Sequence, residues 1–301
     1  MVYWKDYFTP KSIEESVKIL TRYKGTARMI GGGTDLLLEI QQGHRPKVDA
    51  LVDPTHITGL DGISEEDGYL VVGAGVTHTV IVNDPRMEQH ATCLVESCGV
   101  IGGPQVRNVA TLAGNIAHAL PAGDGTIGAL AMGAELQVAS SEGVEWVNME
   151  TTFAGPGEST IDPTRMMIAR IRFKPTGDNE GSSFRRVMRP QGVALPMIAM
   201  AARLSLDGEK IAASRIAIGP AGKVPFLAVR AMEFLKGRDA CDNVFRKAAD
   251  MALSEVNLRS SRHRATMEYR EEMIRIQLPI TLKKAFDRAL GGKAVPEGVG
   301  A

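Results

Sequence analysis

Short amphipathic segments, separated by glycine and proline, follow one another along the first 175 residues. The first of them begins at Ser12 and Glu15, which have the spacing of a capping box, in which a hydroxyl and a carboxylate satisfy free N–H groups at the start of a helix. Apolar side chains at Val17 and Leu20 then follow on one face, and Gly25 can end the segment. The pattern therefore predicts a helix close to the N-terminus.

Runs of aliphatic and β-branched residues bounded by turn residues predict strands in the same region. These runs span residues 27–30, 48–52, 69–72, 135–140, 144–148 and 166–173. An ordered segment is expected to begin at Leu36. One helix is expected after the small residues that begin at Gly73, and another over 92–98. Asp124 is expected to cap another helix, which stops at Gly133.

The last third has a different pattern, in which three long strand segments are followed by helices. The predicted strands span 183–188, 198–206 and 211–218, and the predicted helices span 228–236, 243–253 and about 265–290. This order predicts an antiparallel sheet backed by helices, and the whole chain is expected to be an α+β protein.

Composition suggests where the chain divides. The polar segment 176–181 is expected to link a domain of residues 1–175, with subdomains of about 1–54 and 55–175, to an α+β domain of residues 182–290. Residues 291–301 are expected to form a loosely ordered tail.

The charge and the cysteine content exclude several classes of function. With 35 basic and 35 acidic residues the formal net charge is zero, which argues against nucleic acid or an anionic membrane as a partner. A secretory signal and an apolar run long enough to span a membrane are both missing from the sequence, so we expect a cytoplasmic protein without membrane insertion. Three cysteines without Cys-x-x-Cys spacing do not indicate a disulfide framework, an iron–sulfur site or a zinc site.

Two glycine-containing clusters carry the candidate chemistry. The first is residues 30–36, Ile-Gly-Gly-Gly-Thr-Asp-Leu, and the second is residues 111–115, Thr-Leu-Ala-Gly-Asn, followed by Pro121 and Asp124. Glycine lets consecutive main-chain N–H groups point into one concave surface, which suits an anion such as a diphosphate. The residue spacings of the common ATP-binding and dinucleotide-binding loops are absent, which argues against a site of either kind.

This pair of clusters resembles the FAD-binding subunit of the molybdenum hydroxylases, the family of xanthine dehydrogenase and aerobic carbon monoxide dehydrogenase. In that family a Gly-Gly-Gly-Thr-Asp-Leu-type loop and a Thr-Ile-Gly-Gly-Asn-Ile-x-x-x-x-Pro-x-x-Asp segment hold one flavin. The similarity covers nearly the whole chain, down to residues 264–270, Arg-Ala-Thr-Met-Glu-Tyr-Arg, which resemble the family's Ser-Ala-Glu-Tyr-Arg motif. The resemblance implies a two-part FAD-binding domain of the vanillyl-alcohol oxidase-like type and a C-terminal domain of the carbon monoxide dehydrogenase flavoprotein type.

The resemblance also implies which residues hold FAD. The first cluster would wrap the diphosphate and the ribose, the second would add side chains, Asp124 would bond ribityl or adenosine hydroxyls, and Arg186 would lie near the flavin ring. The full set is Met29, Ile30, Gly31, Gly32, Gly33, Thr34, Asp35, Leu36, Ile101, Thr111, Gly114, Asn115, Asp124, Ile168 and Arg186. Two residues depart from the family pattern: Ala113 stands where glycine is typical, and Arg186 replaces lysine, which changes the hydrogen-bonding geometry but keeps the charge.

No nucleophile, paired carboxylate or histidine pair with metal-ligand spacing is recognisable, so the flavin would supply the chemistry. Among the scattered histidines only His118 falls near the second cluster. By resemblance, FAD on this chain would accept electrons from the [2Fe–2S] clusters of a small subunit, in a dimer of heterotrimers with a molybdopterin-binding large subunit. The final acceptor would be NAD⁺, oxygen or a quinone-linked carrier.

Two alternatives stay open at the level of sequence. A free-standing flavin oxidoreductase of the vanillyl-alcohol oxidase-like superfamily would show bleaching of its flavin by a small substrate without partners. An assembly or scaffold protein that kept the fold would bind no FAD at all.

Overall fold

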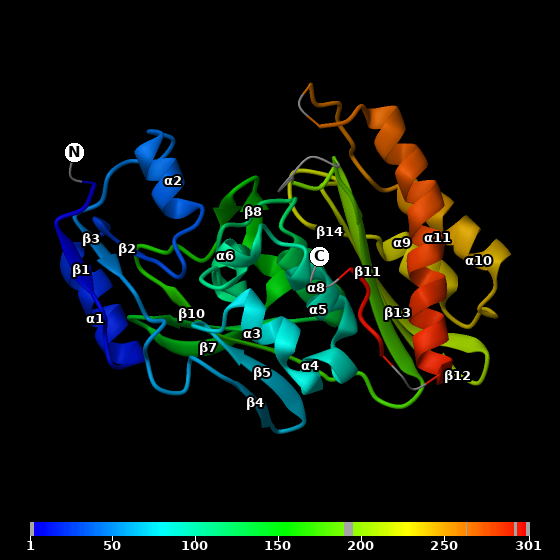
Figure 1. Cartoon of the computed structure of the whole chain (residues 1–301), viewed down its shortest axis with the longest axis horizontal. Coiled ribbons are helices and arrows are strands. Elements are labelled where there is room, and N and C mark those ends of the chain that lie inside the picture. The colour runs from blue at the N-terminus through cyan, green and yellow to red at the C-terminus, as the bar shows by residue number, and fades with distance from the viewer. Residues whose placement is uncertain (1–2, 190–194, 263, 292–293, 299–301) are drawn as a thin grey trace.

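The chain folds into two parts that lie side by side along the long axis of the molecule (Figure 1). The computed structural model describes residues 3–189, 195–262, 264–291 and 294–298. The helices are α1 (Ile13–Tyr23), α2 (Leu36–Gln41), α3 (His78–Asn83), α4 (Pro85–His90), α5 (Thr92–Gly99), α6 (Pro104–Arg107), α7 (Leu112–Ala117), α8 (Asp124–Met132), the 3₁₀ turn η1 (Met149–Thr152), α9 (Val229–Leu235), α10 (Asp242–Leu253) and α11 (Met267–Gly291). The α+β prediction is confirmed.

Two sheets form the N-terminal part. A small parallel sheet has the order β1 (Asp6–Phe8), β3 (Ala50–Val52) and β2 (Ala27–Met29). A five-stranded antiparallel sheet has the order β4 (Ile63–Glu66), β5 (Tyr69–Gly73), β10 (Met167–Phe173), β6 (Glu135–Ser140) and β7 (Gly143–Asn148). A two-stranded ribbon of β8 (Phe153–Gly155) and β9 (Glu158–Ser159) lies after η1. The first glycine cluster leaves the end of β2 directly.

The C-terminal sheet is buried on both faces. Its strands are β11 (Glu180–Val187), β12 (Ile198–Asp207), β13 (Lys210–Gly219) and the short β14 (Phe226–Leu227), all antiparallel. Along β12, Ala199 and Ala201 belong to the core of the N-terminal part, whereas Ile198 and Met200 pack with the residues of α9 to α11. Successive side chains in a strand point to opposite faces, so this alternation places the sheet between two layers of helices.

Most predicted elements are confirmed within a few residues, and the exceptions have physical reasons. The Ser12 hydroxyl accepts from the Glu15 N–H at 3.1 Å as expected, while the Glu15 carboxylate accepts from the Lys11 N–H, one residue before the cap. The prediction that Asp124 caps α8 is wrong, because Gly123 is the N-cap residue and the Asp124 carboxylate is paired with Arg186. Some of the short elements, such as β1 and α4, were not predicted, because three to six positions are too few to show a period.

Described residues of the predicted linker and of the tail make defined main-chain hydrogen bonds. The Thr176 N–H donates to the carbonyl of His90, and β11 already begins at Glu180, so only part of the segment 176–181 connects elements. In the tail, Gly291 ends α11, and the main chain at 295 and 297 bonds to buried side chains. Residues 292–293 and 299–301 lie outside the described part of the chain.

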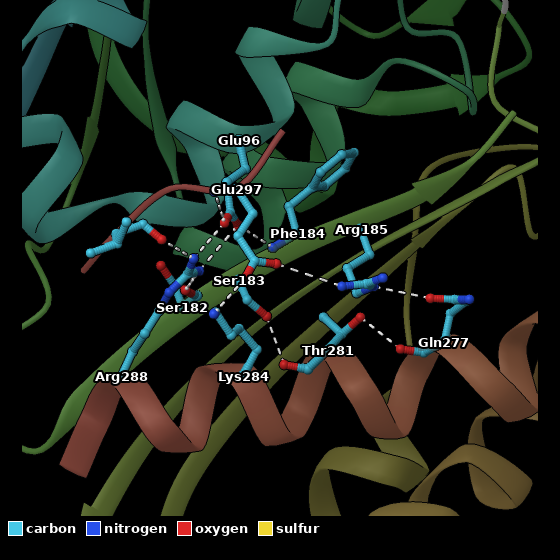
Figure 2. Close-up of polar contacts among 11 residues, drawn as sticks. Glu96, Ser182, Ser183, Phe184, Arg185, Gln277, Thr281, Lys284, Arg288 and Glu297 are labelled. Atoms are coloured by element: carbon cyan, nitrogen blue, oxygen red, sulfur yellow. Dashed lines mark hydrogen bonds and ion pairs between the residues drawn. The ribbon is translucent and has the colours of Figure 1, made fainter. Parts of the chain in front are cut away.

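A buried ion pair joins the two parts of the molecule. Glu96 on α5 and Arg288 on α11 have side chains that are 2% and 4% exposed, and their closest atoms are 2.5 Å apart (Figure 2). Glu96 also accepts from the Phe184 N–H at 2.8 Å and from the Glu297 N–H at 2.9 Å. Arg288 donates to the carbonyls of Ser182 at 2.7 Å and of residue 295 at 2.6 Å. This network, which we call the Glu96 clamp, ties α5, β11, α11 and the tail together.

Removing one member of the Glu96 clamp leaves the other charge buried without its partner. We therefore expect Glu96→Ala to lower the free energy of unfolding by about 3–5 kcal/mol, and the double variant Glu96→Leu/Arg288→Met to recover most of it. Urea unfolding followed by circular dichroism measures both.

The matched control is Lys283→Ala, which breaks the ion pair with Asp287 on the outer face of α11, where both side chains are 49% exposed. Its expected effect is at most about 0.5 kcal/mol. Equal losses in Glu96→Ala and Lys283→Ala would contradict a structural role for the clamp.

Candidate functional site

The first glycine cluster is a bend between β2 and α2, and most of its N–H groups have no main-chain partner among the described residues. Ile30 still donates to the carbonyl of Val52 and Leu37 donates to that of Gly33. Between them, none of the five N–H groups from Gly31 to Asp35 bonds to a main-chain carbonyl of the described residues. Gly33 has a φ of +70°, a conformation that glycine adopts without steric cost. The bend therefore presents a row of unused donors.

The second glycine cluster lies against the first. A Cβ built on Gly32 would be 2.0 Å from the carbonyl oxygen of Val109, and one built on Gly31 would be 2.8 Å from the Thr111 Oγ1. No side chain fits at Gly32, since the atom in the way belongs to the main chain. The first cluster thus packs against the main chain of Val109, just before the second cluster, and against the side chain of Thr111, about eighty residues away in sequence.

The second cluster forms the start of α7. Thr111 is the N-cap residue, and its hydroxyl oxygen accepts from the Gly114 N–H at 3.0 Å. Ala113, which stands where glycine is typical, lies in the first turn of this helix and is not among the residues with positive φ. The methyl group of Ala113 is therefore accommodated without backbone strain.

Asn115 connects α7 to α8. Its Oδ1 accepts from the N–H and from the hydroxyl of Thr126, each at 2.9 Å. The side chain is thus already engaged in holding the two helix starts together, and its amide N–H₂ is the part left to contact a ligand.

Asp124 and Arg186 form an ion pair in the lining of the pocket. The Arg186 Nη1 is 2.7 Å from the Asp124 Oδ2, and the two side chains are 12% and 6% exposed. The other oxygen, Oδ1, is buried and has no hydrogen-bond partner among the described residues. Burial raises the pKa of Asp124 to about 7, against the lowering effect of Arg186. A buried acceptor without a donor is costly, so this oxygen is suited to a ligand hydroxyl.

All of these groups line one pocket of about 350 Å³. Ile168 contributes from β10, at the point where its register against β6 shifts, and Ile101 from the segment after α5. The structure brings together all fifteen residues that the sequence suggested, from Met29 to Arg186.

The pocket also contains side chains that sequence reasoning did not select, among them Arg28, Glu39, Arg45 and His78. His78 is buried, both ring nitrogens lack a partner within the described chain, and burial together with the charge of Arg107 lowers its pKa to about 4. Each of these residues stands alone in the sequence, outside any motif, so its spacing gave no signal.

His118, which the sequence placed near the second cluster, is on the wall of the same pocket, with its Nε2 3.6 Å from the Glu39 Oε1. Within the described ranges, no group of three or more His, Cys, Asp and Glu side chains is arranged to hold a metal ion. Nor does any described helix have the length and apolar character needed to cross a membrane.

Two family profiles match the chain. The profile of the FAD binding domain in molybdopterin dehydrogenase matches residues 3–174, more than half of the chain. The profile of the CO dehydrogenase flavoprotein C-terminal domain matches residues 182–285.

Curated relatives match over most of their length. The xanthine dehydrogenase FAD-binding subunit of Escherichia coli O157:H7 is 28% identical, over 89% of this chain and 91% of the relative. The carbon monoxide dehydrogenase medium chain of Afipia carboxidovorans is 28% identical, over 94% of this chain and 97% of the relative.

Solved structures have the same fold. A chain of the Cu,Mo-CO dehydrogenase, in its cyanide-inactivated form, superimposes with a TM-score of 0.88 at 26% identity, covering 95% of this chain and 99% of that one. A chain of quinoline 2-oxidoreductase from Pseudomonas putida 86 gives a TM-score of 0.86 at 26% identity, covering 95% and 98%. The protein therefore belongs to the molybdopterin dehydrogenase flavoprotein family and is the FAD-binding subunit of a molybdenum hydroxylase.

Proposed function

We propose that one FAD lies in the pocket between the two glycine clusters, where it receives electrons from the [2Fe–2S] clusters of a partner subunit and passes them to a final acceptor. The observation that carries the proposal is the row of N–H groups from Gly31 to Asp35, which have no main-chain partner among the described residues and are held by main-chain contact between Gly32 and Val109, just before α7. Hydrogen bonds to a charged acceptor contribute roughly 1.5–3 kcal/mol each, so such a row supports tight binding of a diphosphate.

The remaining contacts follow from the donors and acceptors that each side chain does not use within the described chain. Asp124 would accept a hydrogen bond from a ribityl hydroxyl through its free Oδ1, and Asn115 would donate through its amide. Ile101 and Ile168 would pack against the ring systems, and Met29, Ile30, Thr34, Leu36, Thr111 and Gly114 would complete the wall.

Arg186 is the residue placed to influence the redox reaction. FAD supplies the electron transfer itself, and it gains negative charge on reduction. Arg186 would place its positive charge beside the reduced ring, while its bond to Asp124 fixes the position of the guanidinium. The chain's own task is thus to bind, orient and electrostatically tune the cofactor.

The wider arrangement of the protein is part of the proposal. We divide the chain into an FAD-binding domain of residues 1–175, with subdomains of about 1–54 and 55–175, and a C-terminal domain of residues 182–290. The ranges of the two family profiles support this division. We expect a cytoplasmic dimer of heterotrimers with an iron–sulfur and a molybdopterin subunit, and this is supported by relatives named as a carbon monoxide dehydrogenase medium chain and a nicotine 6-hydroxylase medium subunit.

Gly32→Ala should abolish FAD retention while leaving a folded core, because the new Cβ cannot coexist with the carbonyl of Val109 and the two clusters must separate. The flavin absorbance of the purified chain after incubation with FAD measures retention, and circular dichroism checks the fold.

Gly62→Ala is the matched control, since a Cβ at Gly62 would meet no atom within 4 Å and Gly62 is not among the glycines with positive φ. It should retain FAD as the native chain does. A Gly32→Ala protein with normal FAD content would contradict the assignment of the pocket.

Arg186→Ala should lower the reduction potential of the bound flavin, because the reduced ring loses a positive neighbour. Loss of one charge-assisted interaction corresponds to about 30–60 mV for a two-electron couple. Equilibration with a reference dye gives the potential.

The neighbouring Arg185→Ala is the control, because Arg185 bonds to Gln277 on α11 and does not line the pocket. Its flavin potential should equal that of the native chain. An unchanged potential in Arg186→Ala would mean that the guanidinium does not face the ring.

A further inference from the structure

His78 is a buried residue whose ring nitrogens are not used by the fold. Its side chain is 1% exposed, and neither Nδ1 nor Nε2 makes a hydrogen bond within the described residues. A neutral imidazole carries one N–H donor and one acceptor nitrogen. Burying both without a partner is unfavourable, so the place of this side chain suits a ligand that supplies the missing hydrogen bonds.

The main chain at His78 is attached to the segment that leads into the second glycine cluster. His78 is the first residue of α3, and its N–H donates to the carbonyl of Ala110 at 3.0 Å. The preceding residue, Thr77, is bridged to Thr111. A Cβ built on Gly32 would be 2.7 Å from the Ala110 nitrogen, so the first cluster packs on the same main chain. His78 therefore lies beside the place where the two clusters meet, and it lines the pocket.

The surroundings of His78 keep its ring neutral. Burial is the main cause that lowers its pKa to about 4, and the charge of Arg107 adds to this effect. The Nη1 of Arg107 donates to the carbonyls of Ile101 and Gly102, at 3.3 and 3.1 Å, so it is engaged away from the imidazole. A neutral ring can donate to an oxygen through one nitrogen and accept from a hydroxyl through the other, and the sugar and phosphate groups of a nucleotide offer both.

On these grounds we propose that His78 is a further binding residue for FAD, whose neutral ring donates to an oxygen of the diphosphate or of a sugar hydroxyl beside it. This inference rests on the proposed function, since it takes the pocket to hold FAD. It adds a buried side chain from α3 to the main-chain donors of the first glycine cluster. It also implies that the chain without FAD retains an unfavourable buried group, which becomes favourable only when the cofactor is bound.

The test compares two properties of His78→Leu, which removes both nitrogens and keeps a side chain of similar size. FAD affinity, measured by isothermal titration calorimetry on the full-length chain purified without FAD, should fall about tenfold. The FAD-free variant should be at least as stable as the native chain in urea unfolding, because no unpaired polar group stays buried. His78→Gln, which keeps a donor and an acceptor, should recover part of the affinity.

His90→Leu is the matched control, because His90 has a partner in the chain and does not line the pocket. Its Nδ1 is 2.8 Å from the carbonyl oxygen of Thr176. The opposite pattern is expected here: the stability of the FAD-free chain should fall, since the carbonyl loses its partner, and the FAD affinity should equal that of the native chain.

NMR of the chain labelled with ¹⁵N at histidine gives a second readout. Addition of FAD should shift the ring nitrogen signals of His78, which are identified by their loss in His78→Leu. The signals of His90 should stay where they are.

The proposal is overturned if His78→Leu binds FAD as tightly as the native chain does, or if FAD does not shift the ring nitrogens of His78. It is also overturned if His78→Leu destabilises the FAD-free chain as His90→Leu does, because the imidazole then serves the fold. A native chain that takes up no FAD overturns the proposed function as well, which separates the two failures.

Discussion

The site depends on a main-chain contact from which side chains are excluded. At Gly32 the first glycine cluster passes so close to the carbonyl of Val109 that even a methyl group would overlap it. The contact holds the end of β2 close to the segment before α7, and residues 31–35 line the pocket beside it. On our proposal, an anion bound here would rely on backbone donors, which are positioned by the fold and need no lysine or arginine.

The rest of the fold keeps this contact in place. The parallel sheet of β1, β3 and β2 carries the first cluster, while α7 and α8 are joined through Asn115 and Thr126. Arg186 reaches Asp124 from β11, so the lining of the pocket includes residues from both parts of the molecule. The Glu96 clamp ties the same strand to α5 and α11, and the geometry at Arg186 therefore depends on how the two parts are docked.

Sequence reasoning recovered most of the fold and the residues of the pocket wall that belong to motifs. Long segments such as α11 and β12 were predicted because many of their residues follow the period of the element. The glycine clusters were found because their composition is unusual. The role of Asp124 at α8 was mistaken, because an aspartate near a helix start has the same appearance whether it caps the helix or pairs with a distant arginine. Arg28, Glu39 and Arg45 could not be selected, since only the folded chain brings these three residues to one wall.

The central claim is that unused main-chain donors hold the cofactor. Amide hydrogen exchange, followed by NMR or mass spectrometry on the full-length chain, measures this directly with and without FAD. The account predicts that the N–H groups of residues 31–35 exchange freely in the absence of FAD and become strongly protected when FAD is added, together with those at the start of α7. Protection that is unchanged by FAD, in a chain that nevertheless binds it, would contradict the account.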